Sequence, residues 1–77
     1  MKIVMYTKKQ CPNCVTAKSI LESKGLKYET HDAEDFVVFK ALLDSYPEAR
    51  QMPQIFINDQ RVGGIAGLQA ALKQVGL

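Results

Sequence analysis

The sequence predicts a single α/β domain in which a mixed four-stranded sheet lies between helices. Short apolar segments typical of strands alternate with amphipathic segments typical of helices, in the order β-α-β-α-β-β-α. Of the 77 residues, 47% are hydrophobic, as in a globular chain near the smallest size that folds around its own core. Two cysteines three positions apart lie between the first strand and the first helix. We therefore expect residues 1–77 to form one domain.

The first half of the chain predicts a strand–helix–strand unit. Ile3–Tyr6 is continuously apolar, which is typical of a central strand buried on both faces. Apolar side chains recur on one helical face over residues 15–24, and Gly25 suits the left-handed residue that ends a helix. Leu26–His31 is the expected second strand. Because such crossovers are right-handed, this strand should run parallel to the first.

A second helix is expected between Asp32 and about Ser45. Asp32 suits the N-cap, and Glu34 and Asp35 suit the first turn, where the helix dipole favours negative charge. Pro47 marks the end of this helix. The helical period predicts a buried stripe made of Phe36, Phe39, Leu42 or Leu43, and Tyr46.

An antiparallel hairpin and a last helix complete the predicted fold. Gln54–Ile57 and residues 60–62 are strand-like, and Asn58–Asp59 between them should form a tight turn. Gly63–Gly64 breaks the strand pattern before a helix over residues 66–75. The buried face of that helix should contain Leu68, Ala71, Leu72 and Val75.

Charge and hydropathy exclude several classes of function. A net charge of +2 is too small to indicate a nucleic-acid or membrane partner. No apolar run approaches the length of a membrane span. The chain turns polar by Thr7, so we expect no signal peptide and a cytoplasmic, reducing setting. In that setting, a close cysteine pair is typical of catalysis rather than of a small domain stabilised by disulfide bonds.

The cysteine pair carries the candidate chemistry. Two thiols at the start of a helix can close a small disulfide, and the unpaired N–H groups there favour an anion. We expect this position to lower the pKa of Cys11 from its ordinary value of about 8.5, helped by Lys8 and Lys9 just before the motif. Pro12 suits the first helical turn, because its missing N–H would be unpaired there. Cys11 should be the exposed attacking thiol and Cys14 the less exposed resolving thiol.

Two other interpretations of the cysteine pair have less support. A closed zinc site needs about four ligands, but the chain has no third cysteine and only one histidine, His31. A structural disulfide over so short a loop gains little from loop-closure entropy. A C-x-x-C pair that follows a strand and opens a helix is instead the pattern of a thioredoxin-like redox motif.

Three motifs occur in order along the chain. Tyr6–Lys8 leads into Cys11–Cys14, Met52–Ile57 follows the second helix, and Gly63–Gly64 follows the hairpin. Together they resemble the motifs of glutaredoxins, small members of the thioredoxin superfamily, over essentially the whole chain. The resemblance implies a thioredoxin-like fold with strand order 2-1-3-4. It also implies a cis Met52–Pro53 bond opposite the cysteines.

The resemblance further implies an enzyme, a dithiol–disulfide oxidoreductase that acts through Cys11 and Cys14. It would reduce protein disulfides or glutathione mixed disulfides, with glutathione as co-substrate and with no bound cofactor or metal. One implied protein partner is ribonucleotide reductase. We expect a monomer without nucleic-acid or membrane partners. The positions implied to bind glutathione or peptide are Lys8, Pro12, Asn13, Arg50, Met52, Pro53, Gly64, Ile65 and Ala66.

The chain departs from the family pattern at two places. Asn13 stands where the family usually has an aromatic residue. After Gly63–Gly64, relatives commonly carry a polar residue and then an aspartate that binds the γ-glutamyl end of glutathione, whereas this chain has Ile65, Ala66 and Gly67. That end would be left to backbone N–H groups and the helix dipole. We therefore expect Gly67→Asp to raise the affinity for glutathione.

Two alternative functions stay open at this point. A weakened glutathione site is compatible with electrons that come from thioredoxin reductase. A bridged dimer that holds an iron–sulfur cluster through Cys11 and glutathione is a different class of protein. Pro12 argues against it, because the glutaredoxins known for this often lack a proline after the first cysteine. His31 is left out of the site, since we expect it at the exposed end of the second strand, away from the motif.

Overall fold

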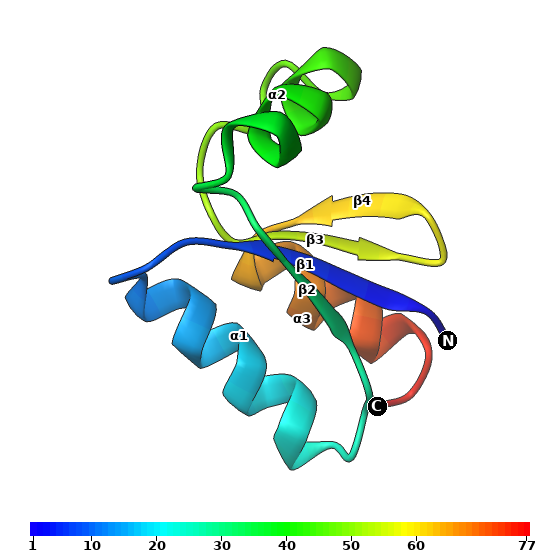
Figure 1. The fold of residues 1–77 in the computed structure, drawn as a ribbon. Helices are drawn as coiled ribbons and strands as arrows, with labels where there is room; N and C mark the ends of the chain where they lie inside the picture. Colours follow the sequence, from blue (N-terminus) through cyan, green and yellow to red (C-terminus); the bar gives the residue numbers. More distant parts are fainter.

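The computed structural model describes residues 1–77 and contains the expected elements in the expected order (Figure 1). They are β1 (Ile3–Thr7), α1 (Pro12–Ser23), β2 (Glu29–Asp32), α2 (Phe36–Ser45), β3 (Gln54–Ile57), β4 (Gln60–Gly63) and α3 (Ile65–Gln74). None of these helices has both the length and the apolar character needed to cross a membrane.

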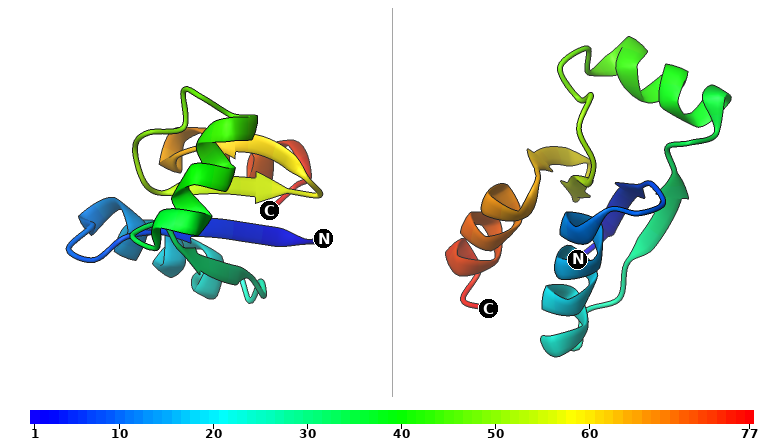
Figure 2. Two further views of the ribbon diagram at one scale, coloured as in Figure 1. Left: turned by 45° about the horizontal axis from the view of Figure 1, so that its top comes forward. Right: turned by 90° about the vertical axis from the view of Figure 1, so that its left-hand side faces the viewer.

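Helices cover both faces of the sheet, as expected. α1 and α3 lie on one face and α2 lies on the other (Figures 1 and 2). The main hydrophobic core lies between the sheet and the α1/α3 pair, and consists of Ile3, Met5, Ala17, Leu21, Ile55, Leu68 and Leu72. Burying each of the larger aliphatic side chains stabilises the fold by about 1.5–3 kcal/mol, so this layer fixes how both helices sit on the sheet.

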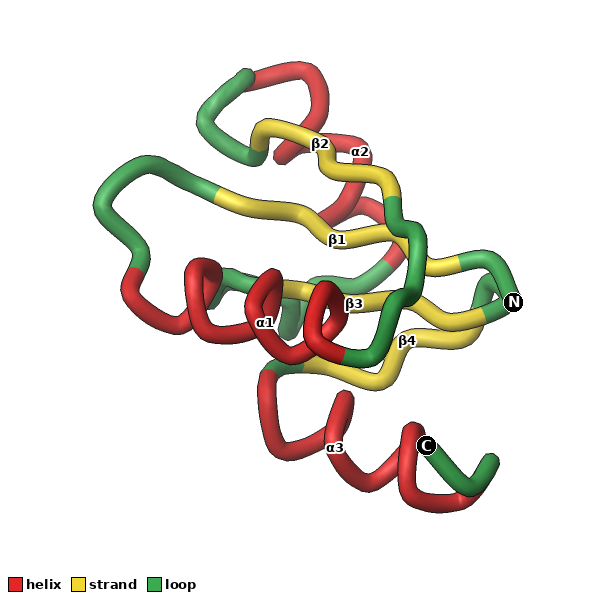
Figure 3. Tube along the Cα trace, turned by 90° about the horizontal axis from the view of Figure 1, so that it is seen from below, coloured by secondary structure: helices red, strands yellow, loops and turns green.

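The strands form one sheet of order β2-β1-β3-β4, as the resemblance implies (Figure 3). β1 is parallel to β2 and antiparallel to β3. β1 therefore ends at the edge of the sheet where β3 begins, and Tyr6 is paired with Gln54 there. The loop that leaves β1 and the loop that enters β3 meet at this edge, which brings Cys11 close to Met52.

Two tight turns predicted from the sequence are confirmed. Gly25, which follows α1, has a φ of 68°. Asn58 and Asp59 have φ values of 51° and 67°, as a two-residue hairpin turn requires. Asn58 Oδ1 also accepts a hydrogen bond from the backbone N–H of Lys2 (2.9 Å), which ties the start of the chain to the hairpin.

A second core lies on the α2 side of the sheet and contains both cysteines. Its buried members are Cys11, Cys14, Ala33, Leu42, Ala49, Met52 and Phe56. Tyr6 and Tyr46 pack edge-on against Phe56, with ring centroids 5.7 and 5.1 Å from its own. The cysteine pair is thus held on one side by tertiary packing, not only by its own helix.

Packing on the α2 side is less complete than the sequence predicts. β1 is fully buried on one face only, because Val4 and Tyr6, which face α2, are partly exposed. Within α2 only Leu42 of the expected stripe is buried, and Phe36 is 75% exposed. Val75 is also wrong as a core residue: it lies beyond the end of α3 and is 61% exposed.

Two element boundaries differ from those expected. β2 covers Glu29–Asp32 rather than residues 26–31, and as an edge strand it is exposed throughout. α2 is capped by Asp35, whose Oδ1 accepts the backbone N–H of Val37 (2.9 Å). Asp32 instead accepts the backbone N–H of Glu34 (2.9 Å) in the preceding turn. The helix consequently starts three residues after the position that Asp32 would set.

Candidate active site

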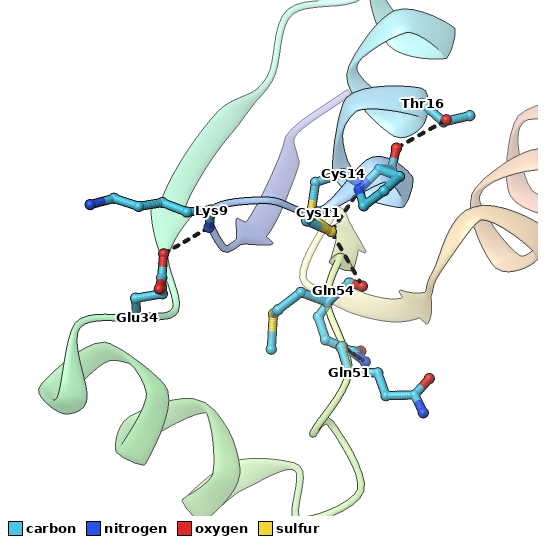
Figure 4. The surroundings of a disulfide bond; sticks show 9 residues. Lys9, Cys11, Cys14, Thr16, Glu34, Gln51 and Gln54 are labelled. Carbon is cyan, nitrogen blue, oxygen red and sulfur yellow. Dashed lines mark hydrogen bonds between the residues drawn. A yellow bond between two sulfur atoms is a disulfide. The ribbon is translucent and has the colours of Figure 1, made fainter.

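Cys11 is the N-cap of α1. Its backbone is extended (φ −118°, ψ 96°), and the helix begins at Pro12 rather than at residue 15, because the fixed φ of proline suits the first helical position. The backbone N–H of Cys14 donates to Cys11 Sγ (3.1 Å), as it would to the oxygen of a capping serine (Figure 4). The sulfur therefore lies at the positive end of the helix dipole and faces a backbone donor.

Cys11 and Cys14 form a disulfide, with 5.2 Å between their Cα atoms. Both are buried in this oxidised state: Cys11 is 7% exposed and Cys14 is 3% exposed. The expectation of an exposed Cys11 is wrong here, because its sulfur packs into the second core and lies 3.7 Å from the carbonyl oxygen of Met52. The relative order holds, since Cys14 is the more buried of the two.

The Met52–Pro53 peptide bond is cis, as the resemblance implies. The contact between Met52 and Cys11 puts this bond opposite the cysteines. Gly64 also lies near this bond, because a Cβ atom at that residue would be 3.9 Å from the Pro53 carbonyl oxygen. The reactive sulfur and the start of α3 therefore both lie close to the cis-proline segment.

A shallow cavity of about 390 Å³ opens over the disulfide. It is lined by Lys8, Gln10, Cys11, Pro12, Cys14, Val15 and Lys18. Two lysines and no acidic residue line it, so its charge favours an anionic substrate. Lys9 does not line it, and the Lys9 backbone N–H donates to Glu34 Oε1 (2.7 Å), which brings a carboxylate to that side of the loop (Figure 4).

Sequence reasoning missed three of these lining residues, Gln10, Val15 and Lys18. Helical spacing could have found two of them. Val15 follows Cys11 by four positions and Lys18 follows Cys14 by four, so each lies on the same helical side as its cysteine.

The start of α3 offers backbone donors. Gly64 is the N-cap and makes no side-chain hydrogen bond, so the first N–H groups of this helix have no side-chain acceptor. Ile65 is partly buried against the main core and Ala66 is exposed. Such an end of a helix suits an anionic group.

Of the nine predicted binding residues, only Lys8 and Pro12 line the cavity over the disulfide, and Arg50 and Asn13 are exposed outside it. Arg50 is exposed in the loop between α2 and β3, and its backbone N–H donates to the carbonyl oxygen of Glu48 (2.8 Å). None of the four ion pairs in the structure involves the Arg50 guanidinium. Asn13 is exposed in the first turn of α1.

His31 lies away from the cysteines. It is exposed on the edge strand β2, and its ring stacks on Tyr6 with centroids 5.2 Å apart. Both rings line a larger cavity of about 590 Å³ on the α2 side of the sheet, which none of the cysteines lines. No three histidine, cysteine or acidic side chains of the chain come together as a set of metal ligands.

Replacing His31 with alanine should change the rate of disulfide reduction by less than about twofold, or about 0.4 kcal/mol in the barrier. The reason is that the helix dipole and the Cys14 N–H already favour the thiolate without a histidine base. Steady-state turnover of His31→Ala, compared with the unmodified protein, measures the effect. A tenfold loss in a folded variant would contradict this placement.

Comparison with known proteins points to one family. The Glutaredoxin family model matches residues 3–62. Glutaredoxin 3 of Escherichia coli (strain K12) is 32% identical over 75 residues, which cover 97% of this chain and 90% of that protein. The probable glutaredoxin slr1562 of Synechocystis is 38% identical over 64 residues, which cover 82% of this chain but only 59% of that protein. The crystal structure of glutaredoxin 1 from Francisella tularensis superposes with a TM-score of 0.78 at 27% identity, covering 96% of this chain and 94% of that one.

Proposed function

The chain belongs to the glutaredoxin family, and on that premise we propose that it reduces protein disulfides and glutathione mixed disulfides. It is a thiol–disulfide oxidoreductase in which Cys11 and Cys14 are the redox pair. The observation that carries this proposal is the position of Cys11 Sγ, which caps α1 and accepts the Cys14 N–H. The same sulfur lies 3.7 Å from the carbonyl oxygen that precedes the cis-proline.

Reduction of a substrate begins at the reduced Cys11. The Cys14 N–H that donates to this sulfur also stabilises a thiolate there. The thiolate attacks one sulfur of the substrate disulfide, forms a mixed disulfide and displaces the other substrate sulfur, which takes up a proton. Cys14, as a thiolate, then attacks Cys11 Sγ and displaces the remaining substrate thiolate. Two electrons pass to the substrate, and the protein is left as the Cys11–Cys14 disulfide.

Glutathione is the proposed reductant, and two molecules of it return the disulfide to the dithiol. Lys8, beside the sulfurs, and Arg50, which has no ion-pair partner, carry charge suited to the glycine carboxylate. The Met52 backbone, next to cis Pro53, pairs with the extended cysteinyl part. The N–H groups at residues 64–66 receive the γ-glutamyl carboxylate. Pro12 and Asn13, in the first turn of α1, are the other residues proposed to contact glutathione.

The electron source tests this proposal. With the mixed disulfide of glutathione and 2-mercaptoethanol as substrate, we expect glutathione plus glutathione reductase to support turnover about tenfold faster than thioredoxin reductase, or about 1.4 kcal/mol in the barrier. Faster turnover with thioredoxin reductase would show that the glutathione site is wrongly assigned while disulfide reduction stands. No turnover with either reductant would overturn the function itself.

We further propose a cytoplasmic monomer whose partners are disulfide-containing proteins, with ribonucleotide reductase as one candidate. The matched relatives include bacterial glutaredoxins. The absence of acidic residues around the cavity favours a substrate disulfide that is flanked by acidic side chains. Gel filtration tests the monomer, and turnover with disulfide peptides of opposite charge tests the preference.

A further inference from the structure

Gln54 is the one buried polar side chain of the protein, at 7% exposure, and both ends of its amide are used. Its Nε2 donates to the backbone carbonyl oxygen of Gln51 (2.8 Å). Its Oε1 accepts a hydrogen bond from Nη1 of Arg61 (3.3 Å). Figure 4 shows Gln54 and Gln51 in the segment that passes the cysteine pair. A buried amide with both ends satisfied fixes its neighbours, because breaking either bond would leave a polar group unpaired.

Arg61 reaches from β4 to both ends of the loop between α2 and β3. Its second arm, through Nη2, donates to Glu48 Oε2 (3.3 Å), and its guanidinium carbon lies 5.6 Å from the centre of the Tyr46 ring. Tyr46 ends α2 and Gln54 begins β3, so one side chain joins the two sides of the loop. The Arg61 side chain is 28% exposed but the Glu48 side chain is 82% exposed, so the contacts to Gln54 and Tyr46 are better shielded from water than the ion pair.

The loop held in this way carries the proposed substrate contacts. Met52 lies in it with its carbonyl oxygen 3.7 Å from Cys11 Sγ, one residue after the carbonyl that Gln54 binds. Arg50 lies between Glu48 and Met52. Because Glu48 is paired with Arg61, the one carboxylate of this loop is kept from Arg50.

We propose that Arg61 and Gln54 are positioning residues for substrate binding. They hold the loop so that the Met52 backbone faces the reactive sulfur, and they leave the Arg50 guanidinium free for an anionic group of the substrate. This role rests on the proposed function, since it concerns the same site. Neither residue touches the sulfurs, so the thiolate chemistry of Cys11 does not depend on them.

Arg61→Ala separates binding from chemistry. We expect the KM for the glutathione mixed disulfide to rise by about tenfold, with kcat changed by less than about twofold. The pH dependence of Cys11 alkylation in the reduced protein should stay unchanged. Arg61→Lys should recover only part of the loss, because one ammonium cannot make the forked contact to Gln54 and Glu48. Gln60→Ala, which changes an exposed neighbour on the same strand, is the matched control and should have the original KM.

Gln54→Glu tests the hydrogen bond between the Gln54 side chain and the Gln51 carbonyl oxygen by itself. The carboxylate keeps an acceptor for Arg61 but loses the N–H that binds the Gln51 carbonyl. We expect this variant to show a raised KM like that of Arg61→Ala, with the Arg61 contact preserved.

Hydrogen exchange gives a readout that does not depend on activity. In the oxidised protein, the hydrogen-bonded loop amides of Ala49 and Arg50, which donate to the carbonyl oxygens of Tyr46 (2.9 Å) and Glu48 (2.8 Å), should exchange at least about fivefold faster in Arg61→Ala and Gln54→Glu than in Gln60→Ala. Unchanged exchange and unchanged KM in the folded variants would overturn the positioning role. So would a fall in kcat accompanied by a shifted alkylation profile. The proposed function is tested separately: it would be wrong if the unmodified protein reduced no disulfide.

Discussion

Cys11→Ser is expected to abolish disulfide reduction, with a loss of about a thousandfold or more, because the hydroxyl that replaces the sulfur cannot form the mixed disulfide. The serine oxygen would still accept the Cys14 N–H at the N-cap, so the fold should be preserved. Loss of activity in this variant therefore reports chemistry and not unfolding. Turnover with a protein disulfide and with a glutathione mixed disulfide, together with thermal unfolding, measures both.

Cys14→Ser is the matched comparison. It should slow the reduction of protein disulfides, because no Cys14 thiolate can attack the mixed disulfide at Cys11. It should spare reactions in which a glutathione thiolate makes that attack instead. Alkylation of the reduced protein at mildly acidic pH, followed by mass mapping, tests the order of the two thiols. Preferential labelling of Cys14 would reverse the assignment made from the helix N-terminus.

The type and order of the elements could be predicted because they depend on local pattern. The apolar run of β1, the turn residues Asn58 and Asp59, and the period of α1 each carry enough information by themselves. The cap of α2 could not be placed in the same way. Asp32 and Asp35 are both suitable caps, and only the path of the chain leaving the sheet selects Asp35.

Burial was harder to predict than secondary structure. The helical period gives the apolar face of α2 but not how closely that face approaches the sheet. Phe36, in the first turn of α2, is exposed, whereas Leu42, two turns later, is buried. A periodic pattern therefore overestimates the core wherever a helix covers only part of a sheet.

In the candidate site, too, residues on one local segment could be predicted, whereas residues brought together by tertiary packing could not. The cysteines, Lys8 and Pro12 could be placed together from the sequence because they lie on one strand-to-helix connection. Gln54 and Arg61 were not recognised, because their role depends on how β4 packs beside the loop that enters β3. No spacing along the chain indicates a side chain that joins the two ends of a loop.

Gly67→Asp is expected to destabilise the protein strongly, which overturns the expectation that it would improve glutathione binding. Gly67 lies in the first turn of α3 and packs directly against the end of β4. A Cβ atom there would meet the backbone carbonyl of Val62, at 1.7 Å from its oxygen and 2.7 Å from its carbon. Because these are backbone atoms, the helix or the strand would have to move, at a cost of about 1–3 kcal/mol or more.

For a domain of this size, that cost corresponds to a fall in Tm of about 4–24 °C. Gly67→Ala should show nearly the same fall, because the first side-chain carbon causes the clash. Ala66→Asp is the control for charge, since residue 66 is exposed in the same helical turn and acidic residues are favoured there. It should keep its Tm and bind glutathione more tightly, by about tenfold if the carboxylate pairs with the α-ammonium group. Thermal unfolding and the dependence of turnover on glutathione concentration measure these effects, and a stable Gly67→Asp variant would mean that α3 can move away from β4.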